Sequence, residues 1–429
     1  MVGADELLQN VPLPPTISPL DIEQPRFEEE AGVPVTDEQV RPGELAPPAR
    51  ILLGPGPCNV HPRVLRALQA PIVGHLDPAY TAVMDETQAL LRRVFQTANE
   101  VTLPISGTGF AGAEAALANL VEPGDRVVVC VNGFFGERMA GIARRCGAEV
   151  HTVHAEWGRI IEPDDVRRAL QAGPTRAVTI VLGETSTGVL QPIDEIARIV
   201  HEHEALFVVD AVTPLGGHPV TVDAWQVDIC HSCSQKCLGC VPGLAPITAS
   251  ERAMRRIRAR RRPVQSFYYD LAELMRYWGP ERFYHHTSPI LLVYALREAL
   301  RLIDEEGLEP RFRRHCLNGE ALQAGLEAMG LRLVAQEGHR MKVLTTVYLP
   351  DDIDEAAVRG ALLNEFNIEV GGGLGALKGR ILRIGLMGAS STRANVLLVL
   401  SALEEVLRRQ GYRCPPGAGL QAAQAVFAR

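Results

Sequence analysis

The chain has 429 residues, of which 46% are apolar and 5% are aromatic, and its formal net charge is −8 at pH 7. This length and apolar content are enough for a full hydrophobic core and predict two lobes in one globular unit. The acidic balance argues against nucleic acid or an anionic membrane surface as the main partner. No apolar run reaches the roughly eighteen residues that a membrane-spanning helix requires, so we expect no membrane partner.

The cysteines and the first residues of the chain indicate a cytoplasmic protein. The sequence contains nine cysteines, and Met1 to Asn10 have neither the basic stretch nor the apolar stretch of a secretory signal. Thiols in a long chain without such a signal are expected to stay reduced rather than to form a disulfide framework. We therefore expect free thiols and a cytoplasmic location.

The first 48 residues differ in composition from the rest of the chain. They are rich in proline and acidic residues, for example Pro14, Pro15 and the glutamates at 28–30, and show little apolar periodicity. Proline fixes φ and removes a backbone donor, so this composition does not favour a packed core. Residues 1–48 are therefore expected to form an extended or disordered arm.

Between residues 49 and 288, short apolar runs alternate with segments of helical periodicity, such as 112–120 and 193–203. This alternation is typical of an α/β fold in which helices cover both faces of a largely parallel sheet. We expect residues 49–288 to form a large domain. The buried strands are expected at 101–106, 126–131, 177–182, 205–210 and 227–232.

Residues 289–412 show longer amphipathic helices and predict a smaller α+β domain. Ser391 is a plausible N-cap of the last helix, which is expected to stop near Gly411. The tail 413–429 is rich in proline and glycine and is expected to be loose, apart from a possible short helix. The other elements expected are helices at 289–305, 311–329 and 354–365 and strands at 342–348, around 368 and at 381–384.

The segment 230–240 permits two incompatible interpretations. Its four cysteines, Cys230, Cys233, Cys237 and Cys240, surround Lys236. The cysteine spacing suggests a soft-metal or cluster site. However, structural zinc sites usually separate their cysteine pairs by a long loop, whereas only three residues separate these pairs. The alternative is that the lysine matters, because Ser-Gln-Lys follows an apolar strand, as in a pyridoxal-phosphate enzyme.

A pyridoxal-phosphate site needs a lysine, a carboxylate for the pyridine nitrogen, a side chain that stacks on the ring, and donors for the phosphate. Asp210 ends an apolar strand, and in open α/β sheets ligands lie at the carboxyl ends of strands. The Ser-Gly-Thr-Gly turn at 106–109 precedes a helix whose N-terminus can face an anion. Residues 183–188 add hydroxyl donors, and Phe135 follows another strand. Each signal is weak alone; together they favour this cofactor over a metal.

The chain resembles the class V aminotransferases of fold type I, and among them the alanine–glyoxylate and serine–pyruvate group. The resemblance extends from about Leu52 to Tyr412 and implies a mainly parallel seven-stranded sheet with a smaller C-terminal α+β domain. It rests on motifs that occur in order along the chain: LLGPGP (52–57), SGTG (106–109), EPGD (122–125), VNGFFG (131–136), ETSTGVLQP (184–192), VDAV (209–212), SQK (234–236), YHHT (284–287), GGLG (372–375) and LRIG (382–385).

The resemblance also implies a role for individual residues. Lys236 would hold pyridoxal 5′-phosphate as a Schiff base and shuttle a proton, and Asp210 would pair with the pyridine nitrogen. Phe135 would stack on one ring face and Val212 would pack on the other. The phosphate would be bound by Thr108, Gly109, Thr185 and Gln235.

Further roles concern the substrate and a second subunit. The resemblance implies that Arg383 clamps the substrate carboxylate and that the backbone of Gly54 closes over small substrates. Tyr284 and Thr287 would reach the phosphate of the other subunit, so that the active unit is a homodimer. Phe110 stands where the alanine–glyoxylate relative has histidine, and the neighbours after Lys236 also differ from the family pattern.

We therefore expect a ping-pong aminotransferase that moves the amino group of a small amino acid, of alanine or serine type, to glyoxylate or pyruvate. Three alternatives are an enzyme of the same fold redirected to a specialised substrate, lyase or desulfurase chemistry, and a non-catalytic descendant. Gln235 before the lysine favours transamination, because the desulfurases carry histidine there. The arginines between 252 and 262 are interpreted as a solvated helix face.

Overall fold

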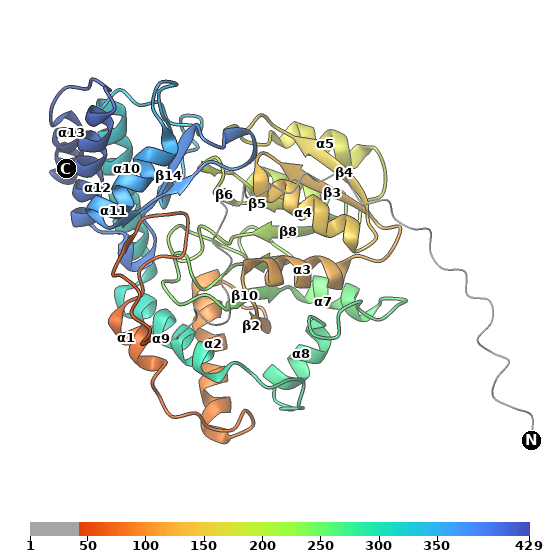
Figure 1. Ribbon diagram of the computed structural model, residues 1–429. Coiled ribbons are helices and arrows are strands. Elements are labelled where there is room, and N and C mark those ends of the chain that lie inside the picture. Colours follow the sequence, from red (N-terminus) through yellow and green to blue (C-terminus); the bar gives the residue numbers. More distant parts are fainter. Residues whose placement is uncertain (1–42) are drawn as a thin grey trace, which may run out of the picture. The chain divides into compact units, whose positions relative to one another are not determined.

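A computed structural model describes residues 43–429 (Figure 1). The chain divides into two units, Met1–Pro48 and Ala49–Arg429. Most of the predicted arm, residues 1–42, lies outside the described residues, and 43–48 form no regular secondary structure. Every helix and strand of the described part lies in the unit Ala49–Arg429, and none of those helices is long and apolar enough to cross a membrane.

A seven-stranded sheet forms the large domain of this unit, in the order β2-β10-β9-β8-β5-β3-β4. Strand β10 runs antiparallel to both of its neighbours, and the other four pairings are parallel. The mainly parallel α/β fold is therefore confirmed. The strands are β2 (Val101–Ser106), β10 (Leu244–Ala249), β9 (Ile229–His231), β8 (Leu206–Asp210), β5 (Ala177–Val181), β3 (Arg126–Val131) and β4 (Glu149–His154).

Helices cover both faces of the sheet, and strand β3 shows this most clearly. Val127 and Val129 pack with residues of helices α3 and α4, whereas Val128 and Cys130 pack with residues of α5 and α6. Because successive side chains of a strand point to opposite faces, β3 is buried on both sides. The helices of this domain are α1 (Pro62–Ala67), α2 (Pro78–Phe95), α3 (Gly109–Leu120), α4 (Phe134–Arg145), α5 (Pro163–Gln171), α6 (Asp194–Glu202), α7 (Glu251–Arg258), α8 (Leu271–Trp278) and α9 (Ile290–Glu306).

A second core lies around a three-stranded antiparallel sheet in the order β11-β14-β13 (Figure 1). Leu53 and Ile368 belong to this core, since the short strand β1 (Ile51–Leu52) pairs with β12 (Ile368–Glu369). Residues 51–53, which were expected in the large domain, thus contribute to the smaller lobe. Its elements are β11 (Leu344–Tyr348), β13 (Gly371–Gly372), β14 (Ile381–Gly385), α10 (Leu308–Ala328), α11 (Glu355–Phe366) and α12 (Arg393–Arg409).

Two features differ from the sequence-based expectations. Helix α9 packs in the core of the large domain, although residues from 289 onward were assigned to the smaller one. The short helix allowed for in the tail forms at Ala418–Phe427 as helix α13, and it is not loose, because it packs against α10. Ala423 and Val426 are buried there, so apolar spacing outweighs the preceding prolines and glycines.

Candidate active site

The residues expected to act together lie at the carboxyl ends of neighbouring strands. Asp210 ends β8, and the loop to Lys236 follows β9, which pairs with β8 in parallel. Strand β2 ends at Ser106, and helix α3 begins at Gly109. The fold thus brings one acid, one lysine and one helix N-terminus to the same edge of the sheet, as the strand pattern predicted.

Lys236 is buried inside this edge, and its amine has one hydrogen-bond partner among residues 43–429. Its Nζ atom donates a hydrogen bond to Oγ1 of Thr213 at 3.0 Å, and only 8% of the residue is exposed. Burial lowers the pKa of the Lys236 amine from its usual value, since desolvation disfavours the charged form. The amine also lies 5.6 Å from the ring centroid of Phe135. A lysine with a lowered pKa is suited to nucleophilic and proton-transfer chemistry.

A glycine-containing loop packs directly on the Lys236 side chain. A Cβ atom added to Gly56 would lie 3.0 Å from Cγ and 3.3 Å from Cε of Lys236, and Gly56 has a φ of +108°. Cys58 also contacts the lysine segment. Its backbone N donates a hydrogen bond to the carbonyl oxygen of Gln235 at 3.1 Å, and its thiol donates one to the carbonyl oxygen of Lys236 at 3.2 Å. The loop therefore holds the lysine from the side of the smaller lobe.

Asp210 is oriented by the chain that follows it. Its Oδ1 atom accepts a hydrogen bond from the backbone N of Val212 at 2.8 Å, and the residue is buried. Oδ2 has no protein partner among residues 43–429 and is available to a ligand. His231 pairs with Asp210 across the β8–β9 ladder and is buried, and neither ring nitrogen has a partner in the described part of the chain.

The turn before α3 leaves donors free. Thr108 is the N-cap of the helix, but its side chain makes no capping hydrogen bond. A Cβ at Gly109 would lie 3.2 Å from Cγ2 of Val212 and 3.4 Å from Cβ of Cys233, so a larger residue would fill this space. The amide oxygen of Gln235 is buried without a hydrogen-bond partner among the described residues, but it is an acceptor, so only the NH2 group of this side chain could donate to an anion. This region can accept an anion at the helix N-terminus.

Phe135 lies in the first turn of α4, where a buried carboxylate fixes the backbone. Oε2 of Glu184 accepts hydrogen bonds from the backbone N atoms of Phe135 at 3.1 Å and Gly136 at 3.3 Å. Oε1 accepts from the backbone N and the hydroxyl of Ser186. Thr185, the next residue along from Glu184, is also buried. The Phe110 ring stacks beside Phe135 with centroids 6.2 Å apart and is 45% exposed.

Arg383 lies on β14 of the smaller lobe and is buried close to the lysine. Its Nε donates to the carbonyl of Gly372 at 2.6 Å, which orients the guanidinium group. Burial lowers its pKa to about 10, so the group is charged at neutral pH. Its terminal nitrogens have no protein acceptor within residues 43–429 and can bind a carboxylate bidentately.

The loop that holds Lys236 also touches the strand beside Arg383. A Cβ at Gly371, which pairs with Arg383, would lie 2.5 Å from Cδ of Pro55. Gly54 is buried, and its carbonyl oxygen would lie 2.1 Å from a Cβ at Gly385. Gly54, Pro55 and Gly56 therefore connect the lysine of the large domain with the arginine of the smaller lobe.

The loop 284–287 presents Tyr284 and Thr287 at the surface. Tyr284 is 51% exposed, and Thr287 is also exposed. His286 joins the loop to the turn before α3, with its Nε2 atom 3.3 Å from Oγ of Ser106. Burial, followed by the charges of His285 and His75, lowers the pKa of His286 to about 4. Within one chain the loop thus lies beside the turn before α3, while Tyr284 and Thr287 are exposed.

The cysteines around Lys236 are all buried and free: Cys230, Cys233, Cys237 and Cys240. In the described part of the chain, no group of three or more His, Cys, Asp or Glu side chains is arranged to hold a metal ion. Burial raises the pKa of the Cys233 thiol to about 11 and that of Cys237 to about 12. Thiols with such pKa values stay protonated at neutral pH and are weak nucleophiles.

Comparisons with known proteins agree with this arrangement. The family model for aminotransferase class V matches residues 64–406. The chain belongs to the class V aminotransferases. Its relatives include the (S)-ureidoglycine–glyoxylate transaminase of Bacillus subtilis, which is 44% identical over 90% of this chain and 97% of that protein. An alanine–glyoxylate aminotransferase of Callithrix jacchus is 40% identical over 86% of this chain and 90% of that protein.

Solved structures of the family are similar to this chain over most of its length. The ureidoglycine-glyoxylate aminotransferase of Bacillus subtilis superposes with a TM-score of 0.88 at 45% identity, covering 90% of this chain and all of that one. An alanine–glyoxylate aminotransferase from a Nostoc species has a TM-score of 0.85 at 48% identity over 88% of this chain and 100% of that chain. Together with the class V match, these relatives confirm the aminotransferase activity and the fold type I architecture predicted from the motifs.

The class V site fits pyridoxal 5′-phosphate, the cofactor that the family implies. The space that a Cβ at Gly109 would fill and the uncapped hydroxyl of Thr108 suit a phosphate group. The free Oδ2 of Asp210 suits a protonated ring nitrogen, and the Phe135 ring faces the lysine amine.

Two residues of this aminotransferase site were missed at the level of sequence. Thr213 gave no signal because a threonine after a strand is usually a packing or turn residue, yet it is the acceptor for Nζ of Lys236. Glu184 was quoted only as part of a motif, although its carboxylate holds the helix turn that carries Phe135. Burial raises the pKa of Glu184, and the hydrogen bonds from Ser186 and Gly136 oppose that shift.

Proposed function

We propose that this aminotransferase uses pyridoxal 5′-phosphate to move the amino group of a small amino acid to a small 2-oxo acid, glyoxylate or pyruvate. The observation that carries the proposal is the buried amine of Lys236, held by Thr213 and lying in one site with Asp210 and Arg383. A lysine, a carboxylate and a carboxylate-binding arginine are the groups that amino-acid chemistry on this cofactor requires. Each comes from a different element of the fold.

The cofactor supplies an electron sink that stabilises negative charge at the substrate α-carbon. Asp210 would keep a proton on the ring nitrogen through Oδ2, which has no partner among residues 43–429. Thr108, Gly109, Thr185 and Gln235 would bind the phosphate. The Phe135 ring would pack on one face of the cofactor and Val212 on the other.

Lys236 moves the proton. Because burial lowers its pKa, the amine is more often neutral at neutral pH than an exposed lysine and can accept a proton from the substrate α-carbon. The Oγ1 atom of Thr213 holds Nζ in place while the amine is free. Carbon acids of this type need a positioned base, and Lys236 is the buried lysine of the site.

Arg383 binds the substrate carboxylate through its two terminal nitrogens. The hydrogen bond from Nε to Gly372 fixes the plane of the guanidinium group, so the carboxylate is held in one orientation. The backbone of Gly54 limits the space for the substrate side chain, which favours small substrates. Phe110 adds an apolar ring near Phe135 where a related enzyme has a polar side chain.

Glyoxylate is the acceptor that the names of both groups of relatives share. We therefore propose glyoxylate as the first acceptor, with alanine or serine as donor. Ureidoglycine is a second candidate donor, because a relative at 44% identity is named for it. The reaction is proposed to run in two half-reactions, with the donor leaving as its oxo acid before the acceptor binds.

Transfer is favoured over desulfurase chemistry. A desulfurase needs a reactive cysteine on an accessible loop, whereas Cys233 and Cys237 are buried with raised pKa values. Gln235 also stands where desulfurases have histidine before the lysine. The thiols around Lys236 are therefore proposed to pack rather than to react.

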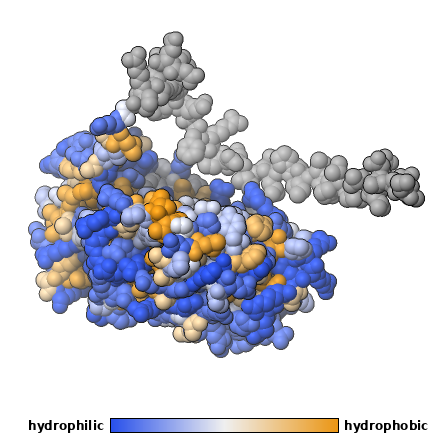
Figure 2. Space-filling view, turned by 90° about the horizontal axis from the view of Figure 1, so that it is seen from below, coloured by the Kyte–Doolittle hydropathy of each residue, from blue (hydrophilic) through white to orange (hydrophobic). Residues whose placement is uncertain are grey.

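We also propose a homodimer in which Tyr284 and Thr287 reach the phosphate site of the partner. Tyr284 and Phe283 are about half exposed, and so are Leu65 and Leu76. Figure 2 shows apolar side chains among hydrophilic ones on the face below Figure 1, where α1, α2 and α8 lie. Apolar surface of this kind suits a subunit interface. The cytoplasmic location stays a prediction.

The donor is identified by mixing the yellow protein with single amino acids and following the loss of absorbance near about 420 nm that is typical of a lysine-bound cofactor. Alanine, serine and ureidoglycine are compared at equal concentration, and glyoxylate is then added to restore the absorbance. Fast bleaching by alanine or serine and recovery with glyoxylate support the proposal. If only ureidoglycine bleaches the protein, ureidoglycine is the donor and alanine and serine are not. If no amino acid bleaches it, the proposed amino-group transfer is contradicted.

A further inference from the structure

Part of the arginine run borders a pocket at the edge of the sheet opposite to Lys236. Glu122 and Asp125 precede β3 and Arg176 precedes β5, so the pocket lies where these parallel strands begin. The catalytic residues lie where parallel strands end. The pocket has a volume of about 290 Å³, and its other charged residues are Arg256, Arg261 and Arg262.

Both acidic side chains of the pocket are already engaged. The two oxygens of Asp125 accept from Nε and a terminal nitrogen of Arg176 at 2.7 and 2.8 Å, which is a bidentate pair. Oε1 of Glu122 accepts from the backbone N atoms of Arg261 and Arg262 at 3.0 and 3.2 Å. Glu122 thus fixes the backbone of the loop after α7. It makes no hydrogen bond with the guanidinium groups of Arg261 and Arg262.

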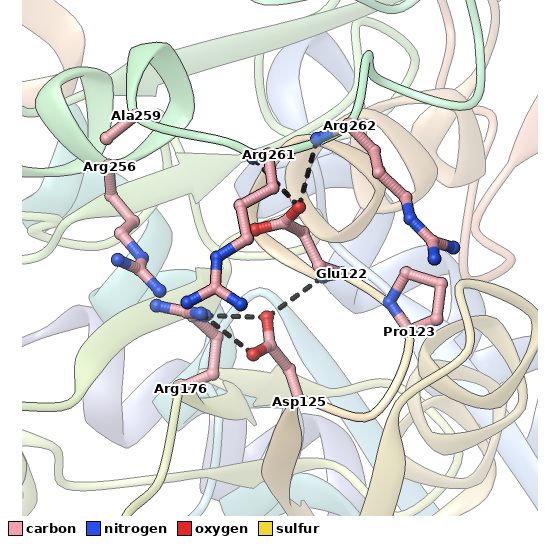
Figure 3. A pocket seen from close by; sticks show the side chains of 8 residues that line it. All are labelled: Glu122, Pro123, Asp125, Arg176, Arg256, Ala259, Arg261 and Arg262. Atoms are coloured by element: carbon pink, nitrogen blue, oxygen red, sulfur yellow. Dashed lines mark hydrogen bonds and ion pairs between the residues drawn. The ribbon is translucent and has the colours of Figure 1, made fainter.

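Three guanidinium groups of the pocket have no acceptor or acidic partner among residues 43–429. They belong to Arg256, Arg261 and Arg262, and all three residues are exposed. Figure 3 shows Arg256 and Arg261 extending toward Arg176 above Asp125, whereas Arg262 extends past Pro123. Four arginines and two acids line the pocket, so its charge is 4 − 2 = +2 on a chain whose net charge is −8.

Other arginines of the same segment have structural partners. Arg252 pairs with the buried Asp228 at 3.0 Å, Arg258 pairs with Glu251, and Arg260 donates to the carbonyls of Asn119 and Val121. The sequence suggested a uniformly solvated helix face, and these partners show that the segment is not one. Some of its arginines contact other parts of the chain, three line the cavity, and Arg255 is exposed away from the cavity.

We propose that this pocket binds a small phosphorylated anion that carries at least two negative charges. Guanidinium groups bind phosphate oxygens bidentately, and several uncompensated cations around one cavity repel each other until an anion joins them. A cavity of about 290 Å³ suits one phosphorylated group rather than a nucleic acid, which needs a long series of phosphate contacts. The acids at its floor and the acidic chain as a whole also oppose a nucleic acid.

Calorimetric titration of the purified enzyme with inorganic pyrophosphate tests the site. The cofactor is first fixed to Lys236 by borohydride reduction, so that pyrophosphate cannot enter the phosphate site of the cofactor. We expect one saturable site per chain at a physiological salt concentration. The double variant Arg256→Ala/Arg261→Ala should bind at least about tenfold more weakly.

Arg255→Ala is the matched control, because Arg255 is exposed on the same helix but does not line the pocket. It should bind pyrophosphate within about twofold of the unmodified enzyme. Before the reduction, all variants should keep the visible absorbance and thermal stability of the parent, since the substituted side chains are exposed. Equal affinity in the double variant, or no saturable binding to the parent, overturns the proposal. Tighter binding of a short DNA duplex than of pyrophosphate, lost in the double variant, overturns it in favour of a nucleic-acid surface.

Discussion

The amine of Lys236 and the hydroxyl oxygen of Thr213 are joined by a hydrogen bond of 3.0 Å inside the site. In the proposed reaction this amine must be free for part of the cycle and must then return to one position. Thr213→Val removes the acceptor but keeps the branched shape. Leaving a buried donor without its partner costs about 1–3 kcal/mol, so kcat/KM should fall about fivefold or more.

Thr213→Ser is the control for that loss. It retains the hydroxyl oxygen and should keep kcat/KM within a fewfold of the parent enzyme. The valine variant lacks this oxygen and should show the lower kcat/KM. Rates of the first half-reaction, followed by loss of visible absorbance, separate this effect from substrate release. Equal rates in the valine and serine variants would show that Thr213 does not position the amine.

Arg383→Lys should damage substrate recognition. Lysine keeps the positive charge but cannot form two parallel hydrogen bonds to a carboxylate. We expect kcat/KM for amino and oxo acids to fall about 10- to 100-fold, mainly through a higher KM. Arg380→Lys, at an exposed arginine of the same region, is the control and should leave the kinetics unchanged. Unchanged KM in the Arg383 variant contradicts the assigned role.

Gly56→Ala tests the contact between the glycine loop and the lysine. The new Cβ would lie 3.0 Å from Cγ of Lys236, and the φ of +108° disfavours any side chain. We expect a loss of about 1–2 kcal/mol in the free energy of unfolding and a clear fall in activity. Gly411→Ala has a similar φ of +91° but meets no atom within 4 Å, so it should lose stability without losing activity. Equal activity in both variants would contradict a functional contact.

The lowered pKa of Lys236 predicts how stability depends on pH. An unfolded lysine has the usual pKa of 10.5, whereas burial lowers the value in the folded protein. The folded state therefore disfavours the protonated amine, and this penalty grows as pH falls below 10.5 until the folded pKa is reached. In protein freed of cofactor, Lys236→Met removes the penalty, so its stability relative to the parent should be greatest at low pH and decline toward pH 10.5.

Each pH unit between the two pKa values should change this difference by up to about 1.4 kcal/mol. Denaturant unfolding at several pH values measures it. Lys378→Met, at an exposed lysine, should show no such dependence and serves as the control. A difference that grows with rising pH would have the wrong sign for a buried lysine with a lowered pKa.

The sheet was largely predictable because its strands are buried on both faces. Strands 101–106 and 126–131 were predicted to the residue, since their apolar runs end sharply. β4 was missed because its polar residues are partly exposed at the sheet edge, and β10 because Pro246 argues against a central strand. In the sheet Pro246 lies opposite Pro104 of β2, and its carbonyl still accepts a hydrogen bond from the backbone N of Ser232 at 2.8 Å.

The site was predictable in its positions but not in its contacts. Lys236, Asp210 and Arg383 stand in motifs, whereas the acceptor Thr213 and the helix-holding Glu184 depend on distances between elements. The contact of Gly56 with Lys236 also joins residues 180 positions apart, and local periodicity carries no information on such pairs. The array of cysteines around Lys236 gave the most misleading signal, because burial rather than ligation explains their surroundings.

The central claim is that Lys236 carries out the chemistry of a transaminase. The most direct test compares the parent enzyme with Lys236→Ala, both loaded with pyridoxal 5′-phosphate, during mixing with alanine followed by glyoxylate. We predict that the parent has absorbance near about 420 nm, which alanine bleaches and glyoxylate restores, and that the alanine variant shows neither the absorbance nor turnover. Turnover retained in Lys236→Ala would contradict the account.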